Sequence, residues 1–353
     1  MANKKAQLNP KATEPEPALP LSTAAPTDLD FGLDLGFGGL KLAGPAGSVE
    51  IPSQVAVDSG QAIADLTGFK KKIVPQRIRF DGSAAFYAGL SAHDWGMQIE
   101  NLDYDRLNGV PETKAILYAG LTLYMRRYGA LTHPIRLTVG LPQEPLAGPD
   151  KDTLIGSVRR WLMGTHTWVS DDTPCQVTVD NVKATSQPAG ALFDYLLDEA
   201  GQFIPARKPN FKKEMGVISV GFNTLEALAL SNREVVPALT TGRKVGVRRL
   251  LEIIDPGHIY SLGELDSKLR LGTLEGVAAA LRLWEREVTG VLEKAWGNRW
   301  RGFAAVLLVG GGVELLKDTL PYRFNGKAIV PEEPVLSIAR GLRKLGRMQA
   351  GRG

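Results

Sequence analysis

F-G-L-D-L-G-F-G-G-L-K, residues 31–41, joins an apolar strand to a glycine-rich turn that ends in a cation. The strand ends at Asp34, and the glycines after it let backbone N–H groups approach an anion without interference from a Cβ atom. Lys41 adds a positive charge just beyond the turn. This pattern is typical of a phosphate cradle, so we expect phosphate contacts from Gly36, Phe37, Gly38, Gly39 and Lys41.

Asp34 stands where its carboxylate would repel phosphate groups. A Mg²⁺ ion or a metal-bound water between the carboxylate and the phosphates removes that repulsion. The stretch therefore predicts a Mg-nucleotide site in which Asp34 holds Mg²⁺ through water. Taken alone, it does not decide between such a site and an ordinary glycine-containing β-hairpin.

The length of the chain, 353 residues, exceeds the about 250–300 residues at which one hydrophobic core stops growing. Two lobes with a cleft between them are therefore expected. The net charge of +4 is too small to indicate a nucleic-acid-binding protein. A single cysteine, Cys175, excludes an internal disulfide framework and fits a structural role in a reducing compartment.

The sequence contains no stretch approaching the roughly 18 apolar residues that cross a bilayer, and its N-terminus lacks an apolar signal core. We therefore expect a cytoplasmic protein without a membrane span. Residues 1–28 are rich in proline, alanine and threonine and cannot bury enough apolar surface to offset the entropy of ordering. They predict a disordered tail.

Apolar runs and helical periodicity predict a mixed order of strands and helices. Strands are expected at residues 31–34, 41–43, 48–51, 135–139, 215–220, 225–230 and 303–309, with two more within 161–180. Helices are expected at residues 112–128, 188–200, 274–296, 313–320 and 334–348. Gln143 and Glu144 follow a strand that ends in G-L-P and are expected in a loop.

The second half of the chain begins as the first half does. A strand at 215–220, a turn containing Gly221 and a strand at 225–230 repeat the order of strand, glycine turn and strand. This repetition predicts a pseudo-duplicated architecture in which two facing hairpins hold a polyphosphate from both sides. A third glycine turn, Gly310 to Gly312, follows the strand expected at 303–309.

These three turns and the segments between them resemble the actin superfamily, and within it the bacterial actin-like proteins related to the plasmid-segregation filament protein ParM. The resemblance covers residues 31–348. It is carried by D-x-G-x-G-x-x-K at 34–41, I-P-S at 51–53, V-G-L-P at 139–142, Q-P-A-G-A at 187–191, Gly221 with Thr224, and V-G-G-G at 309–312.

The resemblance implies an α/β, two-lobed actin-like ATPase fold, with duplicated RNase H-like subdomains and a nucleotide cleft between the lobes. It divides the chain into lobe I at 29–205, with a small subdomain inserted at about 52–110, and lobe II at 206–333, with a small subdomain at about 240–290. Residues 334–353 then form a C-terminal helix that returns to lobe I, followed by a basic tail.

The resemblance also implies roles for individual residues around ATP or GTP with Mg²⁺. The second phosphate loop comprises Gly221, Phe222, Asn223 and Thr224. The third turn, with Gly310, Gly311, Gly312 and Val313, approaches adenosine. Gln143 or Glu144, just after G-L-P, orients the water that attacks the γ-phosphate.

One residue departs from the family pattern. The second loop usually begins with an aspartate that helps to hold the metal and polarise water, whereas this chain has Ser219. Loss of one preorganised group at such a centre typically costs on the order of 10²–10³ in rate, so slow hydrolysis is expected. Glu226, two residues beyond Thr224, is the candidate that compensates as a metal partner, with a solvent-facing carboxylate as the alternative.

The function expected first is a filament-forming actin-like ATPase that acts in plasmid or DNA segregation or in intracellular positioning. Its partners would be further copies of itself and an adaptor that links it to DNA. The alternatives are a small-molecule kinase of the same superfamily and a hydrolysis-deficient nucleotide-binding scaffold.

Three further groups of residues have simpler explanations. The histidines His93, His133, His166 and His258 lack metal-ligand spacing and are expected at the surface or in turns. Trp284, Trp296 and Trp300 are expected in the core or in filament contacts. The basic C-terminal residues are expected to face solvent, with a weak DNA contact as the alternative; they are Arg340, Arg343, Lys344, Arg347 and Arg352.

Overall fold

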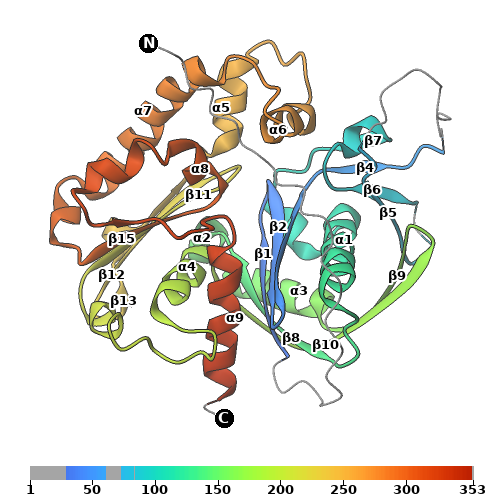
Figure 1. Cartoon of the computed structure of the whole chain (residues 1–353), viewed down its shortest axis with the longest axis horizontal. Coiled ribbons are helices and arrows are strands. Elements are labelled where there is room, and N and C mark those ends of the chain that lie inside the picture. Colours follow the sequence, from blue (N-terminus) through green and yellow to red (C-terminus); the bar gives the residue numbers. More distant parts are fainter. Residues whose placement is uncertain (1–28, 61–72, 83, 352–353) are drawn as a thin grey trace.

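The computed structural model of the chain describes residues 29–60, 73–82 and 84–351. The predicted disordered tail at 1–28, and Arg352, lie outside them. Two β-sheets stand side by side, each with helices packed against it (Figure 1). We call the ten-stranded sheet with its helices lobe I and the six-stranded sheet with its helices lobe II. The two-lobed α/β architecture is as predicted, while the boundaries at residues 205 and 333 stay predictions.

The sheet of lobe I has the strand order β3-β2-β1-β8-β10-β9-β5-β6-β4-β7. Its strands are β1 (Asp30–Leu35), β2 (Gly39–Gly44), β3 (Gly47–Pro52), β4 (Val55–Val57), β5 (Gln76–Arg79), β6 (Phe86–Ala88), β7 (Met97–Ile99), β8 (Ile135–Leu141), β9 (Gly164–Ser170) and β10 (Thr173–Ser186). Strands β1, β8 and β10 are parallel, and β1, β2 and β3 form an antiparallel meander. Every residue of β1 is buried, as expected for an apolar run covered on both faces.

Helices cover both faces of this sheet. On one face lies α1 (Pro111–Tyr128), which begins with the predicted proline signal and packs on β2 and β3. The other face carries α4 (Gln187–Leu196) and α9 (Ser337–Ala350), which contact each other and β8. A Cβ at Gly341 would lie 1.7 Å from the carbonyl oxygen of Gly190, so glycine is required where these two helices cross. Further helices of lobe I are α2 (Gln143–Ala147) and α3 (Lys151–Leu162), with 3₁₀ turns at Ala92–Asp94, Tyr104–Asn108 and Lys208–Lys212.

The sheet of lobe II has the strand order β13-β12-β11-β15-β16, with β14 paired to β12. Its strands are β11 (Met215–Val220), β12 (Leu225–Ser231), β13 (Glu234–Val235), β14 (Thr241–Arg243), β15 (Ala305–Val309) and β16 (Ala328–Ile329). Its helices are α5 (Val247–Ile254), α6 (Leu262–Arg270), α7 (Val277–Trp296) and α8 (Gly311–Leu316), with 3₁₀ turns at Pro237–Leu239, Arg299–Gly302 and Leu320–Phe324. Trp284 and Trp296 are buried in its core, as predicted, and each indole N–H donates to a backbone carbonyl.

Several local predictions are wrong. Gln143 and Glu144 begin the short helix α2 instead of lying in a loop, because its proline, Pro145, falls in the first turn, where a missing N–H costs no hydrogen bond. His166 is buried in the core of lobe I, where its ring contacts the hydroxyl of Tyr118 and the carbonyl of Leu162. The helix expected at 313–320 already begins at Gly311.

The C-terminal helix does not present a free basic face. Arg343 and Lys344 are both buried. Arg343 forms an ion pair with Glu199, and Lys344 forms ion pairs with Asp194 and Glu199. Arg340 is paired with Asp194 and Glu333. The cations are therefore used to dock α9 on α4 and the segment that follows it, and the expectation that they face solvent is wrong for Arg343 and Lys344. In the described part of the chain, no helix is both long enough and apolar enough to cross a membrane.

Candidate functional site

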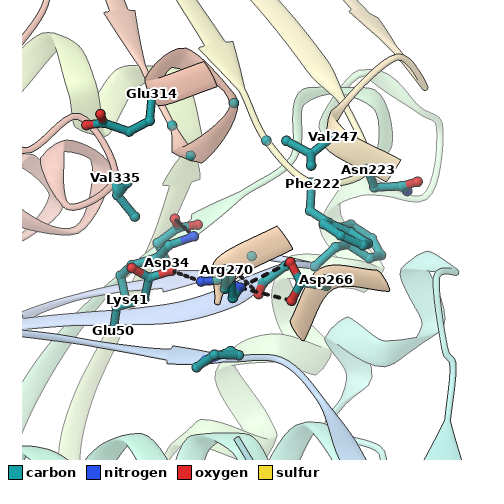
Figure 2. A pocket seen from close by; sticks show the side chains of 18 of the residues that line it. Asp34, Lys41, Glu50, Phe222, Asn223, Val247, Asp266, Arg270, Glu314 and Val335 are labelled. Carbon is teal, nitrogen blue, oxygen red and sulfur yellow. Dashed lines mark hydrogen bonds and ion pairs between the residues drawn. The ribbon is translucent and has the colours of Figure 1, made fainter. Parts of the chain in front are cut away.

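A cavity of about 460 Å³ lies between the two lobes and is lined by residues of both (Figure 2). The lining includes three glycine turns. The first turn, residues 36–38, follows β1; the second turn, residues 221–224, follows β11; the third turn, residues 310–312, follows β15. The structure therefore brings together three segments that are separated by almost the whole length of the chain.

Two carbonyl groups of the first turn accept hydrogen bonds from Ser53. The Ser53 hydroxyl donates to the carbonyl oxygen of Gly36 at 2.8 Å, and the Ser53 N–H donates to that of Gly38 at 3.2 Å. A Cβ at Gly36 would lie 2.5 Å from the carbonyl oxygen of Gly39, so the tight turn requires glycine there. Gly39 is already the first residue of β2 and does not line the cavity.

Asp34 lines the cavity beneath this turn and is buried. Its carboxylate lies 3.8 Å from the ammonium of Lys41 and accepts a hydrogen bond of 2.6 Å from the side-chain amide of Gln187. Burial raises the pKa of Asp34, although Lys41 and Gln187 oppose the rise. The sequence does not predict the contact with Gln187, because the two residues are 153 positions apart.

The second turn rests on the N-terminus of α5. The N–H groups of Val247 and Arg248 donate to the carbonyl oxygens of Gly221 and Phe222 at 3.0 and 2.7 Å. The side chain of Phe222 reaches the first turn, because a Cβ at Gly38 would lie 2.5 Å from the Cβ of Phe222. Asn223 and Thr224 are buried at the cavity wall, and the Asn223 amide nitrogen has no hydrogen-bond partner in the described structure. The two turns are therefore in contact across the cleft.

Ser219, at the end of β11, lines the cavity, and its Cα partner on β12 is Glu226. The alternative of a solvent-facing carboxylate for Glu226 is wrong, since this residue is 2% exposed. One carboxylate oxygen accepts a 2.8 Å hydrogen bond from the backbone N–H of Gln143 in lobe I, and the other has no partner in the described structure. Burial raises the pKa of Glu226 to about 7; the Gln143 N–H opposes the rise, and Asp34 and Glu144 add to it.

The oxygen atoms present fit a Mg²⁺ ion that keeps most of its water. No cluster of three or more His, Cys, Asp or Glu side chains suited to a metal occurs in the described residues. Mg²⁺ commonly binds one or two carboxylates together with waters and substrate phosphates. Asp34 lines the cavity and is a carboxylate group of that kind, whereas Glu226, whose second oxygen has no partner in the described structure, is buried and is not among the lining residues.

Gln143 and Glu144 are not part of the cavity lining. The side-chain amide nitrogen of Gln143 is buried without a partner in the described structure, whereas Glu144 is exposed and accepts a 2.9 Å hydrogen bond from Tyr104. The backbone N–H of Gln143 contacts Glu226 and therefore places Gln143, rather than Glu144, beside the hairpin formed by β11 and β12.

Arg106 is a further buried cation near the first turn that sequence reasoning missed. Its guanidinium carbon lies 4.8 Å from the centre of the Phe37 ring, which is the geometry of a cation–π contact. Burial lowers the pKa of Arg106 to about 10, while nearby Glu112 and Asp34 act in the opposite direction. The residue therefore remains a cation at neutral pH.

The third turn packs against the end of β11. Cβ atoms at Gly310 and Gly312 would lie 2.5 and 2.4 Å from atoms of Val220, whereas Gly311 has open space around it. Gly310 also has φ of +93°, a conformation that favours glycine. Val313 points into the core of lobe II and does not line the cavity, so this residue can offer a ligand only its backbone.

Residues 32–190 match the sequence profile of the N-terminal domain of the actin-like proteins. A search of the curated proteins finds no significant match. Among solved structures, the fold resembles apo pSK41 ParM (TM-score 0.67, 17% identity, covering 91% of this chain and 98% of that one). It also resembles the archaeal actin homologue Ta0583 in complex with ADP (TM-score 0.67, 19% identity, 92% and 99%).

A third similar structure is a subunit of a 15-stranded ParM filament from Clostridium botulinum (TM-score 0.67, 17% identity, 90% of this chain and 99% of that one). The identities are low, so these structures establish the fold. The sequence match of residues 32–190 and the fold of the described chain together support a bacterial actin-like, ParM-like protein.

Proposed function

We propose that this protein binds a nucleoside triphosphate with Mg²⁺ between its lobes and assembles into filaments. The observation that carries the proposal is the convergence of three glycine turns, from both lobes, on one interlobe cavity. A solved relative of the same fold is a complex with ADP, which supports the same use of the cavity here.

In this proposal the first and second turns hold the phosphates from opposite sides. Lys41 supplies a positive charge, and Asp34, oriented by Gln187 at 2.6 Å, would hold Mg²⁺ through water. When bound, Mg²⁺ would neutralise the charge that develops on the phosphates. The third turn, with open space beside Gly311, would accommodate the nucleoside.

Hydrolysis in this proposal is slow, because Ser219 replaces the usual aspartate. Glu226 is the nearest carboxylate on the paired strand, and its free oxygen can accept a proton or orient water. The backbone N–H of Gln143 holds the other oxygen, which links the water-orienting segment of lobe I to lobe II. ATP and GTP are both candidate nucleotides.

Assembly would follow from a head-to-tail contact between copies of the chain, which propagates into a filament when it does not close into a ring. A solved ParM of similar fold forms a filament. Nucleotide state would bias assembly through the relative position of the lobes. We infer a cytoskeletal role in DNA segregation or intracellular positioning through an adaptor, because the ion pairs of Arg340, Arg343 and Lys344 disfavour direct DNA binding.

High-speed pelleting tests this proposal. Purified protein is spun with Mg-ATP, Mg-GTP, Mg-ADP or no nucleotide, and phosphate release is followed in the same tubes. Triphosphate-dependent pelleting with slow release is the expected result. Nucleotide binding without pelleting in any condition would contradict the filament and favour the small-molecule kinase, whose phosphate goes to an added acceptor.

The absence of the aspartate at 219 favours a second candidate, a stable scaffold that binds nucleotide and scarcely hydrolyses it. Ser219→Asp distinguishes the two. A large rise in phosphate release in this variant supports the scaffold, because the missing group alone then limits turnover. No change in release contradicts the scaffold and indicates that Glu226 already supplies the function.

A further inference from the structure

The interlobe cavity is lined by a second cation besides Lys41. Arg270 is the last residue of α6 in lobe II, and its side chain lines the cavity next to the first turn of lobe I. Figure 2 shows it between Asp266 on one side and Asp34, Lys41 and Glu50 on the other. A cation of one lobe is therefore placed at the phosphate turn of the other.

The guanidinium is held firmly in this position. Its Nη2 donates to the carbonyl oxygen of Gly38 at 2.8 Å, and its Nη1 donates to Glu50 at 3.2 Å. Its Nε donates to Asp266 at 2.9 Å. Asp266 is buried and also accepts a 2.8 Å hydrogen bond from Gln54 of lobe I, so the carboxylate that orients Arg270 is itself fixed.

The guanidinium is not saturated by these contacts. Arginine has five N–H donors, and the hydrogen bonds to Gly38, Glu50 and Asp266 use three of them within the described residues. The side chain is 30% exposed, and the exposed part faces the cavity that it lines. A planar guanidinium with donors directed at an anion is the group that proteins use for bidentate phosphate contacts.

We propose that Arg270 is a nucleotide-binding residue that contacts the polyphosphate from lobe II while it stays anchored to the first turn of lobe I. This proposal deepens the proposed function and rests on it. The position of Arg270 makes it complementary to Lys41, which approaches the same turn from lobe I. The phosphates would then meet one cation from each lobe.

The test is a comparison of ligands that do and do not carry phosphate. ATP, adenosine and inorganic tripolyphosphate are titrated into the wild-type protein and Arg270→Gln by calorimetry. We expect Arg270→Gln to lower the affinity for ATP and tripolyphosphate about 10- to 100-fold, while that for adenosine changes less than about threefold. Equal losses for ATP and adenosine, or no loss, would overturn the proposal.

Arg249→Ala is the matched control. Arg249 also belongs to lobe II and also forms a two-bond ion pair, with Glu287 at 2.8 and 2.9 Å, but it does not line the cavity. The Arg249→Ala variant is expected to bind all three ligands with the affinity of the wild-type protein. A loss of ATP affinity in Arg249→Ala as large as in Arg270→Gln would overturn the proposal, because charge anywhere on lobe II would then suffice.

Two further results separate folding and the proposed function from this inference. If Arg270→Gln does not fold, as judged by circular dichroism, Arg270→Lys decides. The affinity of Arg270→Lys for ATP should fall at least about threefold, while its affinity for adenosine stays unchanged, because lysine keeps the charge but loses the planar donors. Equal losses of affinity for ATP and adenosine would contradict the inference. If wild-type protein binds neither ATP nor GTP, the proposed function itself fails.

Discussion

The hairpins that open the two lobes have the same order of strand, glycine turn and strand, yet they place their carboxylates differently. In lobe I, Asp34 stands at the end of the first strand, beside Lys41 and Gln187. In lobe II, Ser219 is the penultimate residue of the matching strand, and the buried carboxylate is Glu226 on the second strand of the hairpin. The repeated order of strand, turn and strand thus carries its buried acidic group on the first strand in lobe I and on the second strand in lobe II.

The turns also differ in how they are supported. The first turn bonds its carbonyls to Ser53 and to Arg270 of the other lobe. The second turn bonds its carbonyls to the first N–H groups of α5 within its own lobe. The conformation of the first turn therefore depends on the relative position of the two lobes, whereas that of the second turn depends on contacts within its own lobe.

The largest effect is expected on triphosphate hydrolysis, when variants of Asp34 in lobe I and Ser219 in lobe II are compared. Asp34→Asn should lower triphosphate hydrolysis by on the order of 10²–10³, since it removes the charge that would order the metal. Ser219→Ala should change it by less than about threefold, because a serine contributes no charge there. Single-turnover phosphate release measures both variants, and equal losses would contradict the assignment of the main acidic role to lobe I.

The next effect concerns the buried carboxylate of lobe II, Glu226. The folded-state pKa of Glu226 is raised from its ordinary 4.5 to about 7, so the neutral form is favoured by folding. The stability that this supplies is fully present below about pH 4.5 and is lost as the pH rises through about 7. Glu226→Gln cannot ionise and should therefore be more stable than the wild type by about 2–3 kcal/mol at pH 8, with a much smaller difference at pH 5.

Urea unfolding at the two pH values measures this difference. Glu275→Gln is the control, because Glu275 is exposed and is not among the charges that act on Glu226. A Glu226→Gln variant that is equally stabilised at pH 5 and pH 8 would show that packing, rather than ionisation, causes the change.

A smaller effect tests the contact between the turns. Gly38→Ala should destabilise the protein by about 1–3 kcal/mol, because the new Cβ would lie 2.5 Å from the Cβ of Phe222. Gly311→Ala adds a Cβ in open space and should cost less than about 1 kcal/mol. Thermal unfolding measures both, and the double variant Gly38→Ala with Phe222→Ala should recover part of the loss if the clash is the cause.

Much of the fold could be predicted because its signals are local. The strands β1, β8, β11, β12 and β15 are apolar runs that lie within about two residues of the expected bounds, and each glycine turn follows its strand. The helix α1 begins at its proline signal, and α7 carries its tryptophans on the buried face. The short helix α2 was missed because five residues give too little periodicity to distinguish a helix from a loop.

The partners of the site residues could not be predicted in the same way. Gln187 lies 153 positions from Asp34, Glu226 lies 83 positions from Gln143, and Arg270 lies 232 positions from Gly38. Spacing along the chain carries no information about such pairs. Likewise, the sequence predicts that the C-terminal cations face solvent, because their acidic partners Asp194 and Glu199 come close only when α9 docks on α4.

The amino-acid sequence by itself determined the strands β1, β8, β11, β12 and β15, the helices α1 and α7 and the three glycine turns, because propensity and turn chemistry act over a few residues. The tertiary structure alone decided that Glu226 is buried with a raised pKa, that Asp34 is held by Gln187, and that Arg270 reaches the turn of the opposite lobe. Burial and long-range contacts set these properties, and both arise only when segments far apart in the sequence pack together in the folded chain.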